Sequence, residues 1–101
     1  MTIAIFGNAQ KSDTIREVQH ILQFMTEKEV HVLLSKELRQ ELSLREYRSF
    51  PDINEEWSEQ MNESVDFALS VGGDGTFLTS AAAIGDKNIP ILGINCGHLG
   101  F

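Results

Sequence analysis

The chain has 101 residues, of which 42% are hydrophobic and 23% charged, and this length predicts one domain with a single core. A net charge of −7 disfavours nucleic-acid partners, because nucleic acids are bound by basic surfaces. No apolar run approaches the ~20 residues of a membrane span, and the start of the chain lacks the basic region of a secretory signal. With a single cysteine, Cys96, and therefore no intramolecular disulfide, we expect a cytoplasmic protein without membrane contact.

The first half of the chain alternates between strand and helix patterns. Residues 3–6 form a short apolar run closed by glycine, which predicts a buried parallel strand. A helix follows, with Ser12 or Asp13 as its N-cap. Its apolar residues recur three and four positions apart: Ile15, Val18, Leu22 and Met25. Residues 30–34 predict a second strand and residues 36–48 a charged helix, which Pro51 ends.

The second half continues the same alternation. Residues 55–63 predict a brief acidic helix, residues 65–71 a third buried strand, and residues 76–84 a helix of small residues that ends at Gly85. Residues 89–94 predict a fourth strand, with proline near its start, where it is tolerated. The expected fold is α/β: a Rossmann-like open parallel sheet of about four strands with helices on both faces.

Ligands of open parallel sheets bind outside the carboxyl ends of the strands. Three segments are expected there, residues 7–9, 72–76 and 95–101, and two of them are rich in glycine. Glycine allows positive φ angles and close approach of the backbone to a ligand. At a strand-to-helix turn, that approach exposes backbone N–H groups that bind phosphate without any net positive charge. On spacing alone, Gly72 and Gly73 could equally form only a tight turn, with Asp74 as the N-cap of the next helix.

Two motifs resemble those of a known family. Gly72-Gly73-Asp74-Gly75-Thr76 is similar to the GGDGT motif of NAD kinases and of lipid kinases of the diacylglycerol and sphingoid-base type; 6-phosphofructokinases have the same motif with serine in the last position. Residues 93–101 resemble the G-x-N-x-G-x-L-G-F motif that follows GGDGT by one helix and one strand in NAD kinases. Because the two motifs occur in this order and at this separation, the chain most resembles the N-terminal α/β domain of NAD kinases.

The resemblance implies a reaction and a set of site residues. The implied reaction is transfer of the γ-phosphate of ATP to the 2′-hydroxyl of the adenosine ribose of NAD, which makes NADP. Asp74 is the implied catalytic residue, which contacts the ribose and accepts the hydroxyl proton. The residues implied to bind NAD are Asp74, Gly75 and Phe101, with Leu99 and Asn95 as weaker candidates. The residues implied to approach the ATP phosphates are Gly72 and Gly73, with Thr76 and Asn8 as weaker candidates.

The physical chemistry is compatible with this reaction. A carboxylate at a helix N-terminus is a weak base, so Asp74 is expected to orient the hydroxyl and to accept its proton late. Mg²⁺ is expected to arrive with ATP, and no dedicated metal site is expected. Cys96 has no evident neighbouring base, and His98 between two glycines is more simply explained as structural.

The resemblance also implies what surrounds these 101 residues. Residues 1–101 would be the N-terminal α/β nucleotide-binding half of an NAD kinase, and the β-rich C-terminal domain would be absent from this chain. The family forms homo-oligomers, so a homo-oligomer is expected of the full-length protein. Two alternatives stay open: a lipid or sugar kinase of the GGDGT superfamily, or a non-catalytic nucleotide-binding module in which Asp74 only caps a helix.

Overall fold

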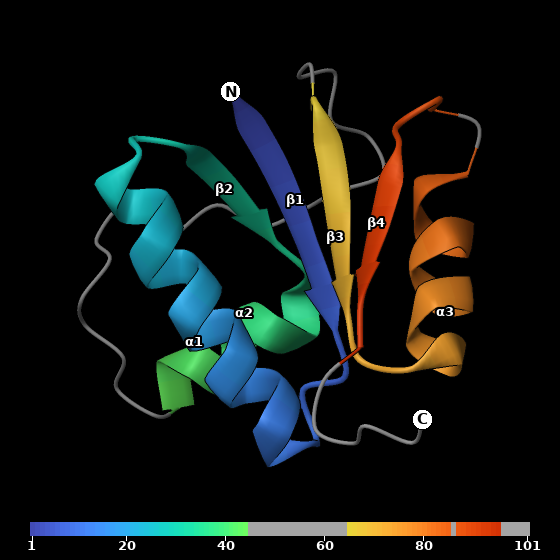
Figure 1. Cartoon of the computed structure of the whole chain (residues 1–101). Helices are drawn as coiled ribbons and strands as arrows, with labels where there is room; N and C mark the ends of the chain where they lie inside the picture. Colours follow the sequence, from blue (N-terminus) through green and yellow to red (C-terminus); the bar gives the residue numbers. More distant parts are fainter. Residues whose placement is uncertain (45–64, 86, 96–101) are drawn as a thin grey trace.

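The computed structural model describes residues 1–44, 65–85 and 87–95, with only the backbone described for Asp74. These residues form a four-stranded sheet in the order β2-β1-β3-β4, and every neighbouring pair is parallel (Figure 1). The strands are β1 (Thr2–Gly7), β2 (His31–Leu34), β3 (Phe67–Val71) and β4 (Ile91–Ile94). The predicted α/β class and the parallel sheet are confirmed.

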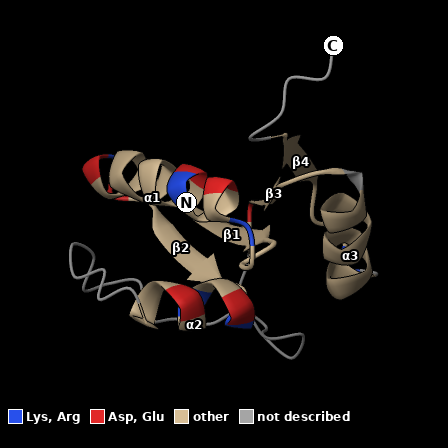
Figure 2. Cartoon of the chain, turned by 90° about the horizontal axis from the view of Figure 1, so that it is seen from below, with Lys and Arg blue, Asp and Glu red and all other residues tan. Residues whose placement is uncertain are grey.

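Helices cover both faces of this sheet. Helix α1 (Ser12–Glu27) follows β1, α2 (Lys36–Leu44) follows β2, and α3 (Asp74–Ile84) follows β3. Figure 2 shows α1 and α3 on opposite sides of the sheet. Alternate residues of β1 point to opposite faces, as a pleated strand requires. Ile3 and Ile5 therefore pack in the core cluster that α1 covers, whereas Ala4 and Phe6 pack in the cluster that includes Ile84 of α3.

The order of the strands positions a ligand site. From β1 the chain passes through α1 to β2, at one edge of the sheet. From β3 it passes through α3 to β4, at the opposite edge. The connections after β1 and β3 thus diverge, although Gly7 and Val71 are register partners at the carboxyl ends of these neighbouring strands. Such a switch point leaves a crevice outside the strand ends, where α/β proteins bind ligands.

The N-cap predicted for α1 was wrong, and the structure also contradicts the alternative in which Asp74 is the N-cap of α3. Lys11 is the N-cap of α1, and its side chain makes no capping bond; its carbonyl accepts the N–H of Ile15 at 3.2 Å, so Ser12 is already helical. In α3 the N-cap is Gly73, whose carbonyl accepts the N–H of Phe77 at 3.1 Å, and the helix starts at Asp74 rather than at Thr76. Asp74 therefore occupies the first helical position, and the alternative in which it is the N-cap does not hold.

Other boundaries differ little from the predictions. The fourth strand begins at Ile91 rather than at residue 89, although the carbonyl of Pro90 still accepts the N–H of Ala68 at 2.8 Å. The predicted helix at 55–63 and the end of the one at 36–48 lie outside the described residues. None of the described helices has the length and apolarity needed to cross a bilayer.

Candidate functional site: a cleft at the strand ends

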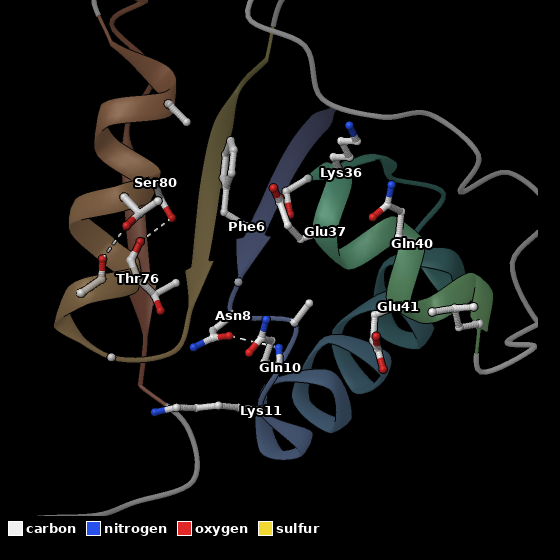
Figure 3. A pocket seen from close by; sticks show the side chains of 18 residues that line it. Phe6, Asn8, Gln10, Lys11, Lys36, Glu37, Gln40, Glu41, Thr76 and Ser80 are labelled. Carbon is white, nitrogen blue, oxygen red and sulfur yellow. Dashed lines mark hydrogen bonds between the residues drawn. The ribbon is translucent and has the colours of Figure 1, made fainter.

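A cleft of about 1140 Å³ opens between α2 and α3 on the Phe6 face of the sheet (Figure 3). Phe6, only 6% exposed, lies at its base between the two helices. The loop that follows β1 closes the cleft at the strand ends, as the switch-point topology requires. The residues that line it include Phe6, Asn8, Lys11, Lys36, Gly73 and Gly75.

The β1–α1 loop is stabilised by its own asparagine. The side-chain Oδ1 of Asn8 accepts the N–H of Gln10 at 3.0 Å, and the carbonyl of Asn8 accepts the N–H of Lys11 at 3.2 Å. Such an Asx turn fixes the orientation of the amide group. With its oxygen used in the turn, the amide of Asn8 presents its NH₂ group as the remaining donor at the rim of the cleft.

The two glycines of the β3–α3 turn differ in their surroundings. Gly72 has a φ of 148°, and its N–H donates to the carbonyl of Ile94 at 2.8 Å, so this donor is used within the sheet. A Cβ at Gly72 would lie 2.8 Å from Oγ1 of Thr76. Gly73 lines the cleft and is exposed, and nothing lies within 4 Å of the place of its missing Cβ. The turn thus needs Gly72 for its backbone shape, while Gly73 leaves open space beside the cleft.

The structure places the other predicted site residues near the same edge of the sheet. Asp74 begins α3, and Gly75 lines the cleft with its carbonyl accepting the Thr79 hydroxyl at 3.0 Å. Asn95 is exposed directly after β4, the neighbour of β3. The predicted residues Leu99 and Phe101 lie outside the described part of the chain, as do Cys96 and His98.

Sequence reasoning missed the α2 wall of the cleft. Ser35 and Lys36 follow the carboxyl end of β2, and the same strand-end rule that selected the other three loops would have selected this one. It also missed the buried serines Ser70 and Ser80, each 2% exposed, which join β3 to α3. Serine inside an apolar strand was the available signal, because buried hydroxyl groups require hydrogen-bond partners.

The cleft offers a ligand both an apolar surface and charged side chains. Its lining combines the ring of Phe6 with two lysines, Lys11 and Lys36, and two glutamates, Glu37 and Glu41. In Figure 3, Lys11 extends along the strand-end side of the cleft, beneath the β3–α3 turn. Within the described ranges, no three His, Cys, Asp or Glu side chains gather as metal ligands do. A nucleotide has an aromatic base that can pack near the ring of Phe6. Its phosphates can approach the open backbone at Gly73 and the cation of Lys11.

Comparison with known proteins identifies the family. Residues 3–101 match the family model of the ATP-NAD kinase N-terminal domain. The chain is 38% identical to an NAD kinase of Cytophaga hutchinsonii over 102 residues, covering 100% of this chain and 35% of that protein. It is 32% identical to an NAD kinase of Methanothermobacter thermautotrophicus over 101 residues, covering 100% of this chain and 33% of that one.

A solved structure shares the fold. The crystal structure of yeast NADH kinase complexed with NADH superposes with a TM-score of 0.79 at 23% identity, covering 100% of this chain and 33% of the yeast chain. The chain thus spans about a third of the length of these relatives. Since the family model extends over nearly every residue, the chain belongs to the ATP-NAD kinase family and corresponds to its N-terminal domain.

Proposed function

We propose that this chain is part of an NAD kinase, which transfers the γ-phosphate of ATP to the 2′-hydroxyl of the adenosine ribose of NAD and so makes NADP. The observation that carries the proposal is the GGDGT turn at the β1/β3 switch point, in a chain whose residues 3–101 match the ATP-NAD kinase N-terminal domain. The relatives are named NAD kinases, and the yeast neighbour was solved with NADH.

The donor ATP binds in the cleft between α2 and α3 with its phosphates at the strand ends. Gly73 supports this placement, because it lines the cleft and leaves room for phosphate oxygens to approach the backbone. Asn8 adds a side-chain donor from the opposite loop. Gly72 contributes through its backbone conformation rather than its N–H, and Thr76 packs against it.

The acceptor NAD binds beside the first turn of α3. Asp74 is the catalytic residue, and Gly75, Asn95, Leu99 and Phe101 complete the NAD contacts within this chain. Phosphoryl transfer passes through a loose transition state, in which positioning and charge neutralisation contribute more than early deprotonation of the nucleophile. Asp74 therefore orients the 2′-hydroxyl and accepts its proton as the new P–O bond forms.

Mg²⁺ enters with ATP and neutralises charge on its phosphates. We assign it no protein ligand within this chain. The remaining proposals concern the whole protein: residues 1–101 are the N-terminal α/β half, a β-rich C-terminal domain completes the NAD site, and the full-length protein is a cytoplasmic homo-oligomer that binds neither nucleic acid nor membranes.

Asp74→Asn tests the catalytic assignment. In full-length protein we expect kcat for NADP formation with Mg-ATP to fall about 10²–10⁴-fold, because the variant cannot accept the proton. Asp13→Asn is the matched control: this exposed carboxylate lies 3.7 Å from Arg16 on the surface of α1, so its loss leaves kcat unchanged. Normal NADP formation by Asp74→Asn would overturn the role of Asp74.

A panel of acceptors tests the reaction itself. The same protein is assayed with NAD, NADH, a diacylglycerol and a hexose phosphate, each with Mg-ATP. Phosphorylation of NAD or NADH, and of neither other acceptor, supports the proposal. Preferred phosphorylation of the lipid or the sugar would contradict it and indicate a lipid or sugar kinase. ATP binding measured by calorimetry with no turnover of any acceptor would instead indicate a nucleotide-binding module.

A further inference from the structure

The turn that carries Asp74 is rich in glycine. Three of the four residues between β3 and Thr76 are glycine, at positions 72, 73 and 75, and glycine populates many backbone conformations. Of these, Gly73 and Gly75 have open space where a Cβ would lie, so they have no side chain of their own to pack against the fold. Contacts on either side of the turn therefore contribute to fixing its conformation.

A short chain of hydrogen bonds joins the two sides of the turn. Oγ of Ser80 lies 2.7 Å from the carbonyl oxygen of Thr76 and 3.0 Å from Oγ of Ser70. A serine hydroxyl has one proton, and a carbonyl can only accept. Ser80 therefore donates to Thr76, and its bond with Ser70 is donated by the Ser70 hydroxyl. This chain links the strand before the turn to the first turn of the helix after it.

The two serines lie where apolar side chains would suit the fold as well. Each is 2% exposed, and Ser70 is the register partner of Phe6 on the face whose core contains Ala4, Ala68 and Ile84. Replacing both partners of a buried hydrogen bond by apolar groups is nearly neutral for stability, whereas removing one partner is costly. What the hydroxyl pair adds over an apolar pair is a directional contact with a defined geometry.

We propose that Ser70 and Ser80 are positioning residues that hold the first turn of α3, and with it Asp74, in the geometry for phosphoryl transfer. The inference rests on the proposed function for its kinetic consequence, but the hydrogen-bonded link itself is a property of the fold. Thr76 reinforces the link, because its side chain occupies the space next to Gly72. Ser80 also lines the cleft, but its hydroxyl is used in the bonds to Thr76 and Ser70, so both serines act through the turn.

Kinetics of Ser80→Ala and of the double variant Ser70→Ala/Ser80→Ala test the proposal in full-length protein. In Ser80→Ala we expect kcat to fall about tenfold with KM for ATP and NAD nearly unchanged, because misplacement of the reacting groups affects chiefly the transition state. In the double variant we expect the melting temperature to recover while kcat stays low. Thr26→Ala is the matched control. The Thr26 hydroxyl of α1 donates to the carbonyl of Leu22, four residues earlier, at 2.9 Å, so this variant removes a bond of the same type away from the turn.

Two results would overturn the proposal. Recovery of kcat together with the melting temperature in the double variant would show that the serines serve stability alone. An equal loss of kcat in Thr26→Ala would show that the effect is not specific to this link.

Amide hydrogen exchange tests the link independently of activity. The N–H of Phe77, bonded to the carbonyl of Gly73, is expected to exchange faster in Ser80→Ala and in the double variant, and at the wild-type rate in Thr26→Ala. An unchanged exchange rate of the Phe77 N–H in Ser80→Ala would show that the serine link does not hold the turn, even if the enzyme is active. If the wild-type protein phosphorylates no acceptor, the proposed function fails, and the exchange result still decides whether the link holds the turn.

Discussion

At the residue scale, adjacent glycines of the GGDGT turn meet different demands. The φ of 148° at Gly72 is unfavourable for any side chain, and Thr76 already fills the space that a Cβ would take. Gly73 has a φ of −105° and open surroundings, so its backbone tolerates a side chain. Both positions of the motif are glycine, but the fold requires Gly72, whereas Gly73 leaves room at the cleft.

This difference predicts unequal effects of alanine. Gly72→Ala should lower the free energy of unfolding by about 1–3 kcal/mol, because it forces a strained backbone against Thr76. Gly73→Ala should change it by less than about 1 kcal/mol. Urea denaturation of both variants measures this, and equal losses would contradict the assignment. A raised KM for ATP in Gly73→Ala would separately support the proposed phosphate site.

At the element scale, α1 and α3 are held to the sheet in different ways. Helix α1 has an apolar stripe with the period of a helix, and three of its apolar residues are at most 1% exposed: Ile15, Val18 and Leu22. Helix α3 has no such stripe: Leu78 is 69% exposed, whereas Ser80 is 2% and Ile84 3% exposed. Periodicity therefore identifies the buried side of α1, whereas the orientation of α3 depends on contacts such as those of Thr76 and Ser80.

Truncation of the α1 stripe should be costly. Leu22 is fully buried in the main core cluster, so Leu22→Ala should lower the free energy of unfolding by about 2–5 kcal/mol through lost packing and the cavity left behind. Leu44 is 79% exposed at the end of α2, and Leu44→Ala should cost less than about 0.5 kcal/mol. Thermal unfolding of the two variants compares them, and a similar small loss in both would argue against the described core.

At the scale of the whole molecule, the chain corresponds to about a third of its relatives. The cleft proposed to bind ATP lies within this third, whereas the proposed acceptor site requires contacts from the remaining two thirds of an NAD kinase. We expect residues 1–101 alone to make no NADP from NAD and Mg-ATP, while the full-length protein does. A sensitive coupled assay of both proteins tests this, and NADP formation by residues 1–101 would show that one domain suffices.

Much of the fold was predictable because its signals are local. Apolar runs predicted the four strands, and the spacing of apolar residues predicted α1 and its buried stripe. The structure confirms all four strands and this helix. The starts of α1 and α3 were predicted wrongly, because Ser, Asp and Thr are favoured at N-caps but the turns before these helices place Lys11 and Gly73 there. The geometry of the strand-to-helix connections, rather than the N-cap preference of single residues, decided where these helices begin.

The sequence by itself determined the α/β class, three candidate site loops and the family resemblance, because strand and helix periods and the two motifs are properties of neighbouring residues. Only the tertiary structure decided the strand order, the cleft between α2 and α3, and the pairing of Ser70 with Ser80. These depend on which side of the sheet each connection crosses and on contacts between separate elements. Strand order in particular made two glycine-containing turns neighbours at one switch point, although 65 residues separate Gly7 from Gly72 along the chain.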